Sequence, residues 1–267
     1  MESICVITPC FNAARYLPSC LQSVAAQGKR VHKHIVMDGG SKDGSADILD
    51  EFSRQDPNLV WRSERDEGQS DALNKALALV DSRYFGWLNA DDCYLPGRIA
   101  PLIEAAQSAP APSIVYGDYQ VIDANGALVK RRQQPSFNYW DCLYSYLTVQ
   151  NAAAIFSTDI CRQTGGFDKN FEFCMDYDLI LRLASKGPVH HVRQYIGSFR
   201  HHADAKTSRL QHICESETQR LRLTVSGRSA TSLRRRQLIG KMRVATRMLL
   251  EGCLASRLSS SNGDGSR

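Results

Sequence analysis

Two adjacent carboxylates follow an apolar run in the first half of the chain. Asp91 and Asp92 come after the apolar residues 85–88 and the pair Asn89-Ala90. Neighbouring carboxylates repel each other, and burying them is costly unless a cation or hydrogen-bond donors compensate. Mg²⁺ and Mn²⁺ prefer oxygen ligands and typically bind one or two carboxylates together with substrate phosphates. The pair therefore indicates a divalent metal site, with a solvated turn or a helix N-cap as the alternative.

A glycine-rich segment follows another carboxylate, Asp38. Glycines let a backbone approach a ligand closely, and Asp38 could accept a hydrogen bond from a base or a ribose. The segment 38–44 matches neither the P-loop nor the Gly-x-Gly-x-x-Gly fingerprint. This mismatch disfavours an ATPase and a Rossmann dehydrogenase.

Two more clusters lie where helices are expected to begin. Ser70 can cap a helix and Asp71 suits its first turn, whereas Asn74 is unfavourable in mid-helix and needs a reason to be there. Further on, Asp176 and Asp178 are two residues apart, so only one of them should face a cleft. Helix capping is the alternative role for Asp176.

The elements alternate in an order that brings these clusters together. Short apolar runs alternate with segments of helical periodicity, which predicts an α/β fold with a mostly parallel central sheet flanked by helices. Ligands in such sheets bind beyond the carboxyl ends of the strands. The predicted strands are 4–8, 34–37, 59–61 and 85–88, with helices 15–27, 45–54 and 70–80 between them. Later come strands 114–118, 119–122, 127–132 and 151–156 and helices 159–164 and 176–185.

The composition excludes several classes of protein. The chain has 267 residues and is 43% hydrophobic, so disordered, collagen-like and multispan membrane proteins are excluded. Nine cysteines without a Cys-x-x-Cys motif indicate reduced thiols, and no secretion signal is visible at the N-terminus. We therefore expect a cytoplasmic protein.

The charge is concentrated near the C-terminus. Residues 219–258 hold ten Arg or Lys residues and one acid, whereas residues 1–218 hold 22 basic and 26 acidic residues. The basic segment Leu233–Leu258 has helical periodicity and could lie on the inner face of a membrane as a peripheral contact. The alternatives are packing on the catalytic domain or in a homo-oligomer; nucleic acid is disfavoured because no aromatic residue could stack on bases. The expected apolar stripe is Leu238, Met242, Ala245, Leu249 and Cys253, with Arg236, Arg243 and Arg247 opposite.

Taken in order, these motifs resemble the family 2 glycosyltransferases with the GT-A fold. The resemblance covers about residues 3–208 and includes Thr8-Pro9, Asp38-Gly39-Gly40 and Asn89-Ala90-Asp91-Asp92. It implies a Rossmann-like sheet, a catalytic domain at 1–210, a basic helical C-terminal extension at 211–258 and a disordered tail at 259–267. The matching segments are 6–12, 36–44, 66–75, 87–92, 165–168 and 176–183.

The resemblance also implies site residues. Asp91 and Asp92 would bind Mn²⁺ or Mg²⁺. Asn89 replaces the first carboxylate of the family's Asp-x-Asp motif. It therefore stays open which of the two aspartates binds the metal directly. Met175 replaces a family Glu, so Asp176 alone is the candidate catalytic base. The implied nucleotide-sugar contacts are Thr8, Pro9, Asn12, Asp38, Gly40, Asp66, Gly68, Asp71, Asn74, Asn89, Asp91 and His202, the last within the family's Arg-x-His segment.

The expected reaction is transfer of a sugar, with inversion, from a nucleotide-diphosphate-sugar to a hydroxyl acceptor. A UDP-sugar donor and a sugar or lipid-linked acceptor are favoured, in bacterial cell-surface polysaccharide or lipopolysaccharide synthesis. A nucleotidyltransferase is the alternative enzyme, although the segment 8–12 lacks the glycine-rich basic loop usual in that class. A non-catalytic sugar-nucleotide-binding module is the other alternative, because Asn89 and Met175 replace family carboxylates.

Overall fold

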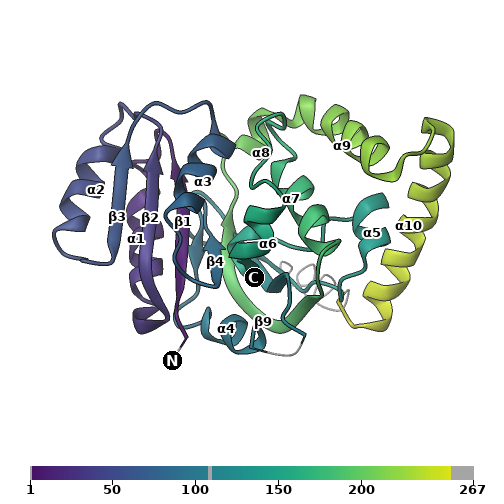
Figure 1. Ribbon diagram of the computed structural model, residues 1–267, viewed down its shortest axis with the longest axis horizontal. Helices are drawn as coiled ribbons and strands as arrows, with labels where there is room; N and C mark the ends of the chain where they lie inside the picture. The colour runs from purple at the N-terminus through teal and green to yellow at the C-terminus, as the bar shows by residue number, and fades with distance from the viewer. Residues whose placement is uncertain (1, 108–109, 254–267) are drawn as a thin grey trace, which may run out of the picture.

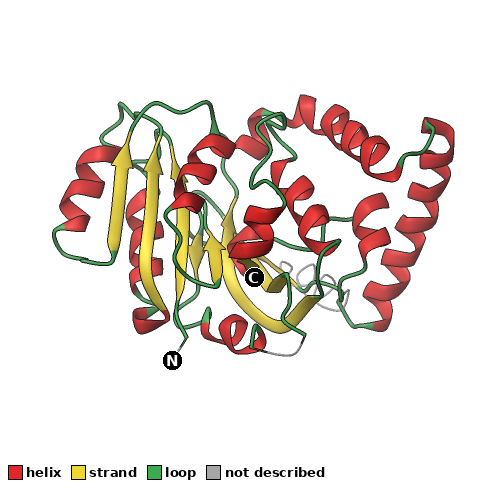
Figure 2. Cartoon of the chain, viewed as in Figure 1, coloured by secondary structure: helices red, strands yellow, loops and turns green. Residues whose placement is uncertain are grey.

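A mixed nine-stranded sheet runs through the molecule (Figure 2). The computed structural model describes residues 2–107 and 110–253, so residues 254–258 of the predicted extension and the predicted tail at 259–267 lie outside the described residues. The strand order is β3-β2-β1-β4-β8-β6-β9-β5, and β7 pairs with β6. Helices cover both faces of this sheet, which confirms the predicted α/β class (Figures 1 and 2).

The first four strands are parallel and are joined by helices, as predicted. The predicted starts at 4, 45 and 59 agree with the structure, and the other boundaries differ by one to three residues, because helix and strand ends are weakly specified by local sequence. The elements are β1 (Ile4–Cys10), α1 (Leu17–Ala25), η1 (Gly28–Arg30), β2 (Val31–Asp38), α2 (Ser45–Ser53), β3 (Leu59–Ser63), α3 (Gln69–Ala78) and β4 (Tyr84–Trp87).

The second half completes the sheet with mixed pairing. Strand β8 is antiparallel to both β4 and β6, β6 and β7 form an antiparallel hairpin, and β9 is parallel to β6. No expectation covered β9, because its polar residues interrupt any apolar run. The elements are β5 (Cys93–Tyr94), α4 (Ala100–Ala105), β6 (Ile114–Ile122), β7 (Leu128–Arg132), α5 (Tyr139–Tyr144), η2 (Asn151–Ala153), β8 (Ala154–Ser157), α6 (Thr158–Gln163), α7 (Met175–Ala184) and β9 (Val189–Arg200).

Alternating side chains of β1 build the core on both faces of the sheet. Cys5 and Ile7 pack in the cluster that contains α3 and α7, whereas Ile4 and Val6 pack in the cluster that contains α1 and α4. All four are essentially inaccessible to solvent. A strand covered on both faces reads as a continuous apolar run, which is the pattern that identified β1.

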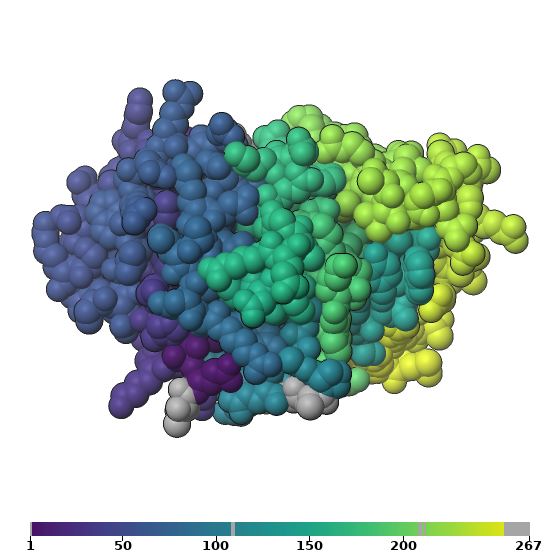
Figure 3. Space-filling view, in the orientation of Figure 1, coloured from purple at the N-terminus to yellow at the C-terminus, as the bar shows by residue number. Residues whose placement is uncertain are grey.

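Three helices close the described chain, and the last two pack against the rest of the molecule (Figures 1 and 3). Leu221 and Leu233 belong to the same buried cluster as α7. Asp141 in α5 forms ion pairs with Arg243 and Arg247, at 3.3 and 2.8 Å. The three helices are α8 (Lys206–Arg209), α9 (Gln211–Ser226) and α10 (Ala230–Leu250).

The predicted orientation of the apolar stripe on α10 is wrong. The helix buries Leu233, Gly240, Val244 and Met248. Because these residues face the body of the protein, the predicted apolar stripe points outward, with Leu238, Met242 and Leu249 each more than 60% exposed. Two of the arginines expected on a solvated face instead contact Asp141. Cys253 of that stripe is buried.

All nine cysteines are free, and seven of them are buried. Among the described residues, none of the helices combines the length and the apolar character that crossing a membrane would require.

Candidate active site

The loops that follow β1 and β2 are joined at the carboxyl edge of the sheet. Asn12 adopts a positive φ of 48° and accepts a hydrogen bond at Oδ1 from the backbone N–H of Lys42, at 3.0 Å. The backbone N–H of Asn12 donates to Ser41 Oγ at 2.7 Å. Asn12 therefore connects Thr8-Pro9 with the glycine-rich loop, as one surface that a nucleotide could contact.

Asp38 organises the loop that follows it. Its Oδ2 atom accepts hydrogen bonds from the N–H groups of Gly40 and Ser41, at 3.2 and 3.0 Å, and from Ser63 Oγ at 2.6 Å. Its side chain is almost fully buried. Thr8 is also buried, and its Oγ1 lies 2.9 Å from His34 Nε2. Nucleotide contacts by the side chains of Asp38 and Thr8 stay a prediction, because both side chains are engaged in hydrogen bonds within the protein.

Asp66 lies directly over the glycine-rich loop. An added Cβ on Gly39 would come within 2.6 Å of Asp66 Oδ2, so a larger residue at this position would displace the carboxylate. Asp66 Oδ1 accepts a hydrogen bond from Gly68 N–H at 2.9 Å. Gly68 and Gly40 adopt φ values of 107° and 81°, which favour glycine. The fold thus brings together predicted donor contacts from two separate loops.

The side chains of Asp71 and Asn74 on α3 are both held by contacts within the protein. Burial alone would raise the pKa of Asp71, but Glu67 N–H, Lys169 and Lys75 outweigh that effect and lower the pKa. The Asn74 side chain pairs with the backbone of Phe167, accepting from its N–H and donating to its carbonyl, both at 2.8 Å. This pairing explains an asparagine in mid-helix, and a nucleotide contact by Asn74 stays a prediction.

Asp92 is buried in the turn directly before β5. Its Oδ1 accepts a hydrogen bond from Arg200 N–H at 2.8 Å, and its Oδ2 lies 3.4 Å from Asn89 Nδ2. Burial and the neighbouring Asp91 carboxylate raise the pKa of Asp92 well above its usual range. The role of Asp92 as a metal ligand stays a prediction, and the structure shows this carboxyl enclosed and already hydrogen-bonded.

Asp91 is the accessible member of the pair. Its side chain is 27% exposed, and Oδ2 lies 3.0 Å from Nε2 of His202, whose ring packs against Tyr16 at 4.5 Å. Arg200 Nε donates a hydrogen bond to the backbone carbonyl of Asp91 at 2.8 Å. Arg200 and His202, at and just after the end of β9, therefore both hold the turn that contains Asp91. The fold thus joins two predicted residues that are 111 positions apart in sequence.

Asp176 occupies the first turn of α7, where the predicted base was placed. Its Oδ1 accepts a hydrogen bond from Tyr177 N–H at 2.7 Å. Burial raises the pKa of Asp176 above its ordinary value, although backbone N–H groups and the charge of Lys206 act in the opposite direction. A carboxylate whose pKa is raised accepts a proton more readily, which suits a general base.

A hydrogen-bond network that the sequence did not predict connects these parts. Lys206 Nζ donates to Gln69 Oε1 at 3.0 Å, and Gln69 Nε2 donates to Asn89 Oδ1 at 2.9 Å. Ser70 Oγ contacts Met175 Sδ at 3.0 Å, which brings the starts of α3 and α7 together. Burial lowers the pKa of Lys206, against the attraction of nearby acids that include Asp176. A single lysine carries no local motif, so only its position in space could identify it.

Glu217 on α9 was also missed. Its carboxylate accepts hydrogen bonds from three consecutive backbone N–H groups, those of residues 172–174, at 2.8 to 2.9 Å. These residues lead directly into α7, so a helix outside the predicted catalytic domain positions the segment that carries Asp176.

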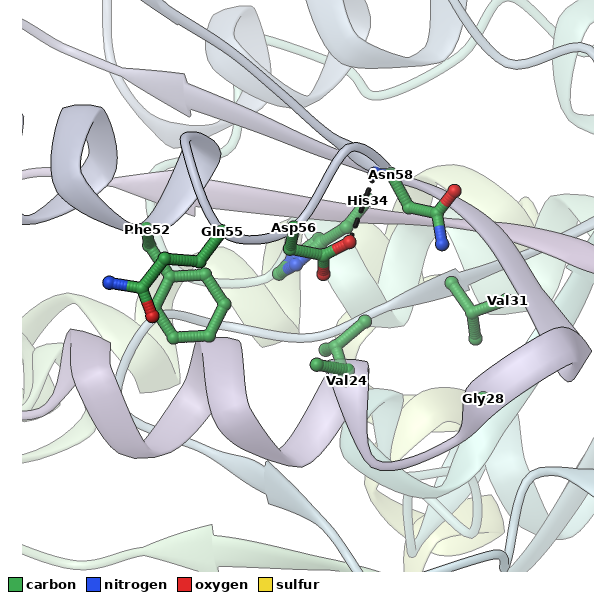
Figure 4. Close-up of a pocket in the computed structure, with 9 residues that line it drawn as sticks. Val24, Gly28, Val31, His34, Phe52, Gln55, Asp56 and Asn58 are labelled. Carbon is green, nitrogen blue, oxygen red and sulfur yellow. Dashed lines mark hydrogen bonds between the residues drawn. The ribbon is translucent and has the colours of Figure 1, made fainter.

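A pocket of about 280 Å³ lies away from the predicted site residues, and His34 forms part of its wall (Figure 4). It is enclosed by the end of α1, the start of β2 and the α2–β3 loop, with Phe52, Gln55 and Asn58 among its lining residues. Ligand pockets usually measure about 300–1,000 Å³. The predicted site residues do not line this pocket.

Comparison with known proteins identifies the family. The family model described as glycosyl transferase family 2 matches residues 5–171, which include the carboxyl edge of the parallel strands. The chain belongs to glycosyl transferase family 2. The resemblance drawn from the motifs is thereby confirmed.

Relatives of this family 2 chain include larger proteins. It is 24% identical to the chondroitin synthase of Escherichia coli over 72% of this chain and 28% of that protein. It is 30% identical to an uncharacterized glycosyltransferase of Mycobacterium tuberculosis over 68% of this chain and 69% of that protein. The chain thus spans only about a quarter to a third of the length of several curated relatives.

Solved structures share the GT-A fold of this family 2 chain. The mannosyltransferase PcManGT from Pyrobaculum calidifontis, in complex with GDP-Man and Mn²⁺, superposes with a TM-score of 0.65 at 16% identity, covering 100% of this chain and 77% of that one. S. aureus TarS residues 1–349, in complex with UDP-GlcNAc, superposes with a TM-score of 0.63 at 14% identity, covering 78% and 61%. At these identities the likeness establishes the fold.

Proposed function

We propose that the chain transfers a sugar from a nucleotide-diphosphate-sugar to a hydroxyl acceptor, with inversion at the anomeric carbon. The observation that carries this proposal is the Asp91–His202 pair at the carboxyl edge. Asn89, two residues before Asp91, accepts a hydrogen bond from Gln69, which in turn accepts one from Lys206, whose ammonium lies near Asp176. The pair offers a cation site for a diphosphate, and Asp176 offers a base. Membership of glycosyl transferase family 2 supports the same reaction.

The donor nucleotide would lie against the loops after β1, β2 and β3. Asn12, Gly40 and Asp66 form this surface, and Asp38 shapes it from below. We favour a UDP-sugar. The TarS complex with UDP-GlcNAc supports that choice. Because PcManGT binds GDP-Man, GDP-sugars should be assayed as well.

Asp91 and His202 suit Mn²⁺ better than Mg²⁺. Their facing atoms are a carboxylate oxygen and an imidazole nitrogen, and Mg²⁺ strongly prefers oxygen alone. When bound, the ion supplies positive charge that offsets the charge developing on the leaving diphosphate. Asp92 and Arg200 hold the Asp91 turn in place.

Asp176 would act on the acceptor. The acceptor oxygen forms a bond to the anomeric carbon while the bond from that carbon to the diphosphate oxygen breaks on the opposite face. Asp176 takes the hydroxyl proton during the attack, and general base catalysis of this kind contributes about 10²–10⁴-fold. Lys206, a cation beside the same site, would stabilise negative charge.

We further propose a role in bacterial cell-surface polysaccharide synthesis with a lipid-linked acceptor. The exposed apolar side chains of α10, together with six Arg or Lys residues and no acid over 230–250, suit the surface of an anionic membrane. The relation to E. coli chondroitin synthase supports a polymer-building role.

Release of the nucleotide tests the proposal. The full chain is incubated with a panel of UDP- and GDP-sugars, Mn²⁺ and candidate acceptors, and free UDP or GDP is measured. We expect release that depends on acceptor and metal, with Asp91→Asn as the inactive control. Binding without release would favour the sugar-nucleotide-binding module, and release of pyrophosphate from a nucleoside triphosphate and a sugar phosphate would favour a nucleotidyltransferase.

A further inference from the structure

A cysteine, a histidine and an aspartate meet at the opposite edge of the sheet from the candidate active site. Cys5 lies near the start of β1, His32 near the start of β2, and Asp81 in the turn between α3 and β4. Cys5 Sγ lies 3.1 Å from Asp81 Oδ1 and 3.6 Å from His32 Nε2, and His32 Nε2 lies 2.8 Å from Asp81 Oδ1. Three different ligand types therefore converge on one point.

These separations are close to those of a tetrahedral zinc site. Bond lengths of about 2.3 Å to sulfur and about 2.0–2.2 Å to nitrogen and oxygen place neighbouring ligands about 3.4–3.6 Å apart. The Sγ–Nε2 separation of 3.6 Å fits without change. The two separations that involve Asp81 must widen by about half an ångström, which its side chain, 54% exposed, can provide by rotation.

Each ligand is also oriented by a second contact. Ser3 Oγ lies 2.9 Å from His32 Nδ1, which leaves Nε2 directed at Cys5 and Asp81. Lys33 binds the other carboxylate oxygen of Asp81, which leaves Oδ1 for the cluster. Ser82 Oγ accepts a hydrogen bond from Cys5 N–H at 2.8 Å. Partners of this kind hold metal ligands in place in known sites.

We propose that Cys5, His32 and Asp81 bind a thiophilic divalent cation, Zn²⁺ in the first instance. The side chains of His32 and Asp81 are 37% and 54% exposed, so solvent can supply water as the fourth ligand. Sulfur ligation selects against Mg²⁺ and Mn²⁺, so this site would differ in specificity from the Asp91–His202 pair. The bound ion would join the starts of β1 and β2 to the turn before β4 and stabilise the edge remote from catalysis.

Cobalt titration of the full chain tests the proposal. We expect one equivalent of Co²⁺ to produce thiolate-to-cobalt charge-transfer absorption in the near ultraviolet, and Zn²⁺ to abolish it by displacement. Cys5→Ser and His32→Gln should each remove the band. Because His32 is partly exposed, His32→Gln should keep the native circular dichroism spectrum even if Cys5→Ser does not fold.

Two matched controls separate this site from others. Cys214→Ser, at a partly exposed cysteine on α9, and Asp91→Asn, in the candidate active site, should leave the band unchanged. Zn²⁺ should also raise the melting temperature of the unsubstituted chain but not of His32→Gln. Absence of the band, or a band of equal intensity in folded His32→Gln, would overturn the proposal.

Discussion

At the scale of single residues, burial divides the carboxylates of the site into different roles. Asp91 is partly exposed and faces His202, whereas Asp92 is enclosed and has a raised pKa. Asp176 also has a raised pKa but is only partly buried, at the start of α7. The roles we propose for these three acids, cation ligand, anchor and base, rest on this difference in environment.

Asp176→Asn should separate catalysis from stability. We expect turnover to fall by at least about 10²-fold, with donor binding kept. Because folding raises the pKa of Asp176, the ionised carboxylate lowers stability at neutral pH, and the neutral amide should keep or raise the melting temperature. For the same reason kcat of the unsubstituted chain should rise with pH through this raised pKa. Asp159→Asn, at an exposed helix start, is the control, and near-normal turnover by folded Asp176→Asn would refute the role.

Asp91→Asn and Asp92→Asn should differ. Asp91→Asn removes the charged atom that faces His202, so Mn²⁺-stimulated turnover should fall by about 10²-fold or more, as expected when charge stabilisation is lost. Asp92→Asn retains an acceptor for Arg200 N–H and replaces a carboxyl whose pKa is already raised. Its turnover should fall by about tenfold or less. Turnover assayed across Mn²⁺ concentrations decides the point, and the reverse order would assign the metal to Asp92.

At the scale of elements, the site depends on contacts between parts distant in sequence. The pairing of β1 with β2 places His34 beneath Thr8, and α9 contributes Glu217 to the segment before α7. Both contacts act on elements that carry site residues, so their loss should change both stability and function.

His34 should make stability sensitive to acid. Burial lowers the pKa of His34 to about 3, whereas an unfolded histidine takes up a proton near pH 6.5. Between these values the unfolded chain binds one more proton, so His34 should lower the free energy of unfolding by up to about 1.4 kcal/mol per pH unit as the pH falls. Urea unfolding of His34→Gln should show a slope smaller by that amount, with exposed His212→Gln as the control. Equal slopes would contradict the assignment.

Glu217→Gln should loosen the segment before α7. The amide keeps one acceptor oxygen but loses the charge that three N–H groups share, so we expect a loss of about 1–3 kcal/mol of stability. Because Asp176 follows this segment, kcat should fall more than the KM for the donor rises. Glu215→Gln, exposed on the same helix, is the matched control. Unchanged melting temperature and kcat in Glu217→Gln would show that the contact is dispensable.

At the scale of the whole molecule, α10 has two apolar faces. One packs on α5 and the core, and the other exposes Leu238, Met242 and Leu249. The exposed face lies on a helix with a strong positive charge, which favours an anionic lipid surface as its partner.

Vesicle flotation tests this surface. The full chain should float with vesicles that contain anionic lipid and should float much less with neutral vesicles or at high salt. The triple variant Leu238→Gln, Met242→Gln, Leu249→Gln should lose most of the binding, whereas substitution of exposed Thr231 and Thr246 by Gln should not. Equal flotation of the two variants would exclude the apolar face, and concentration-dependent dimerisation without flotation would assign it to a second copy.

Much of the parallel half of the fold could be predicted because its signals are local. Apolar runs such as 4–8 and the helical periodicity between them are set by neighbouring residues, and the motifs lie at the ends of those runs. Strand β9 could not be predicted in the same way, because its pairing with β6 decides its structure more than its own residues do.

The sequence by itself determined the family, the α/β class and the places where catalytic chemistry could occur, because motif order and periodicity are evident without knowledge of any tertiary contact. Only the tertiary structure decided which acid is accessible, since Asp91 and Asp92 are chemically identical neighbours and are distinguished by Arg200 and His202 more than a hundred residues away. It likewise decided which face of α10 is buried, because periodicity finds the apolar stripes of a helix but the neighbouring elements choose between them.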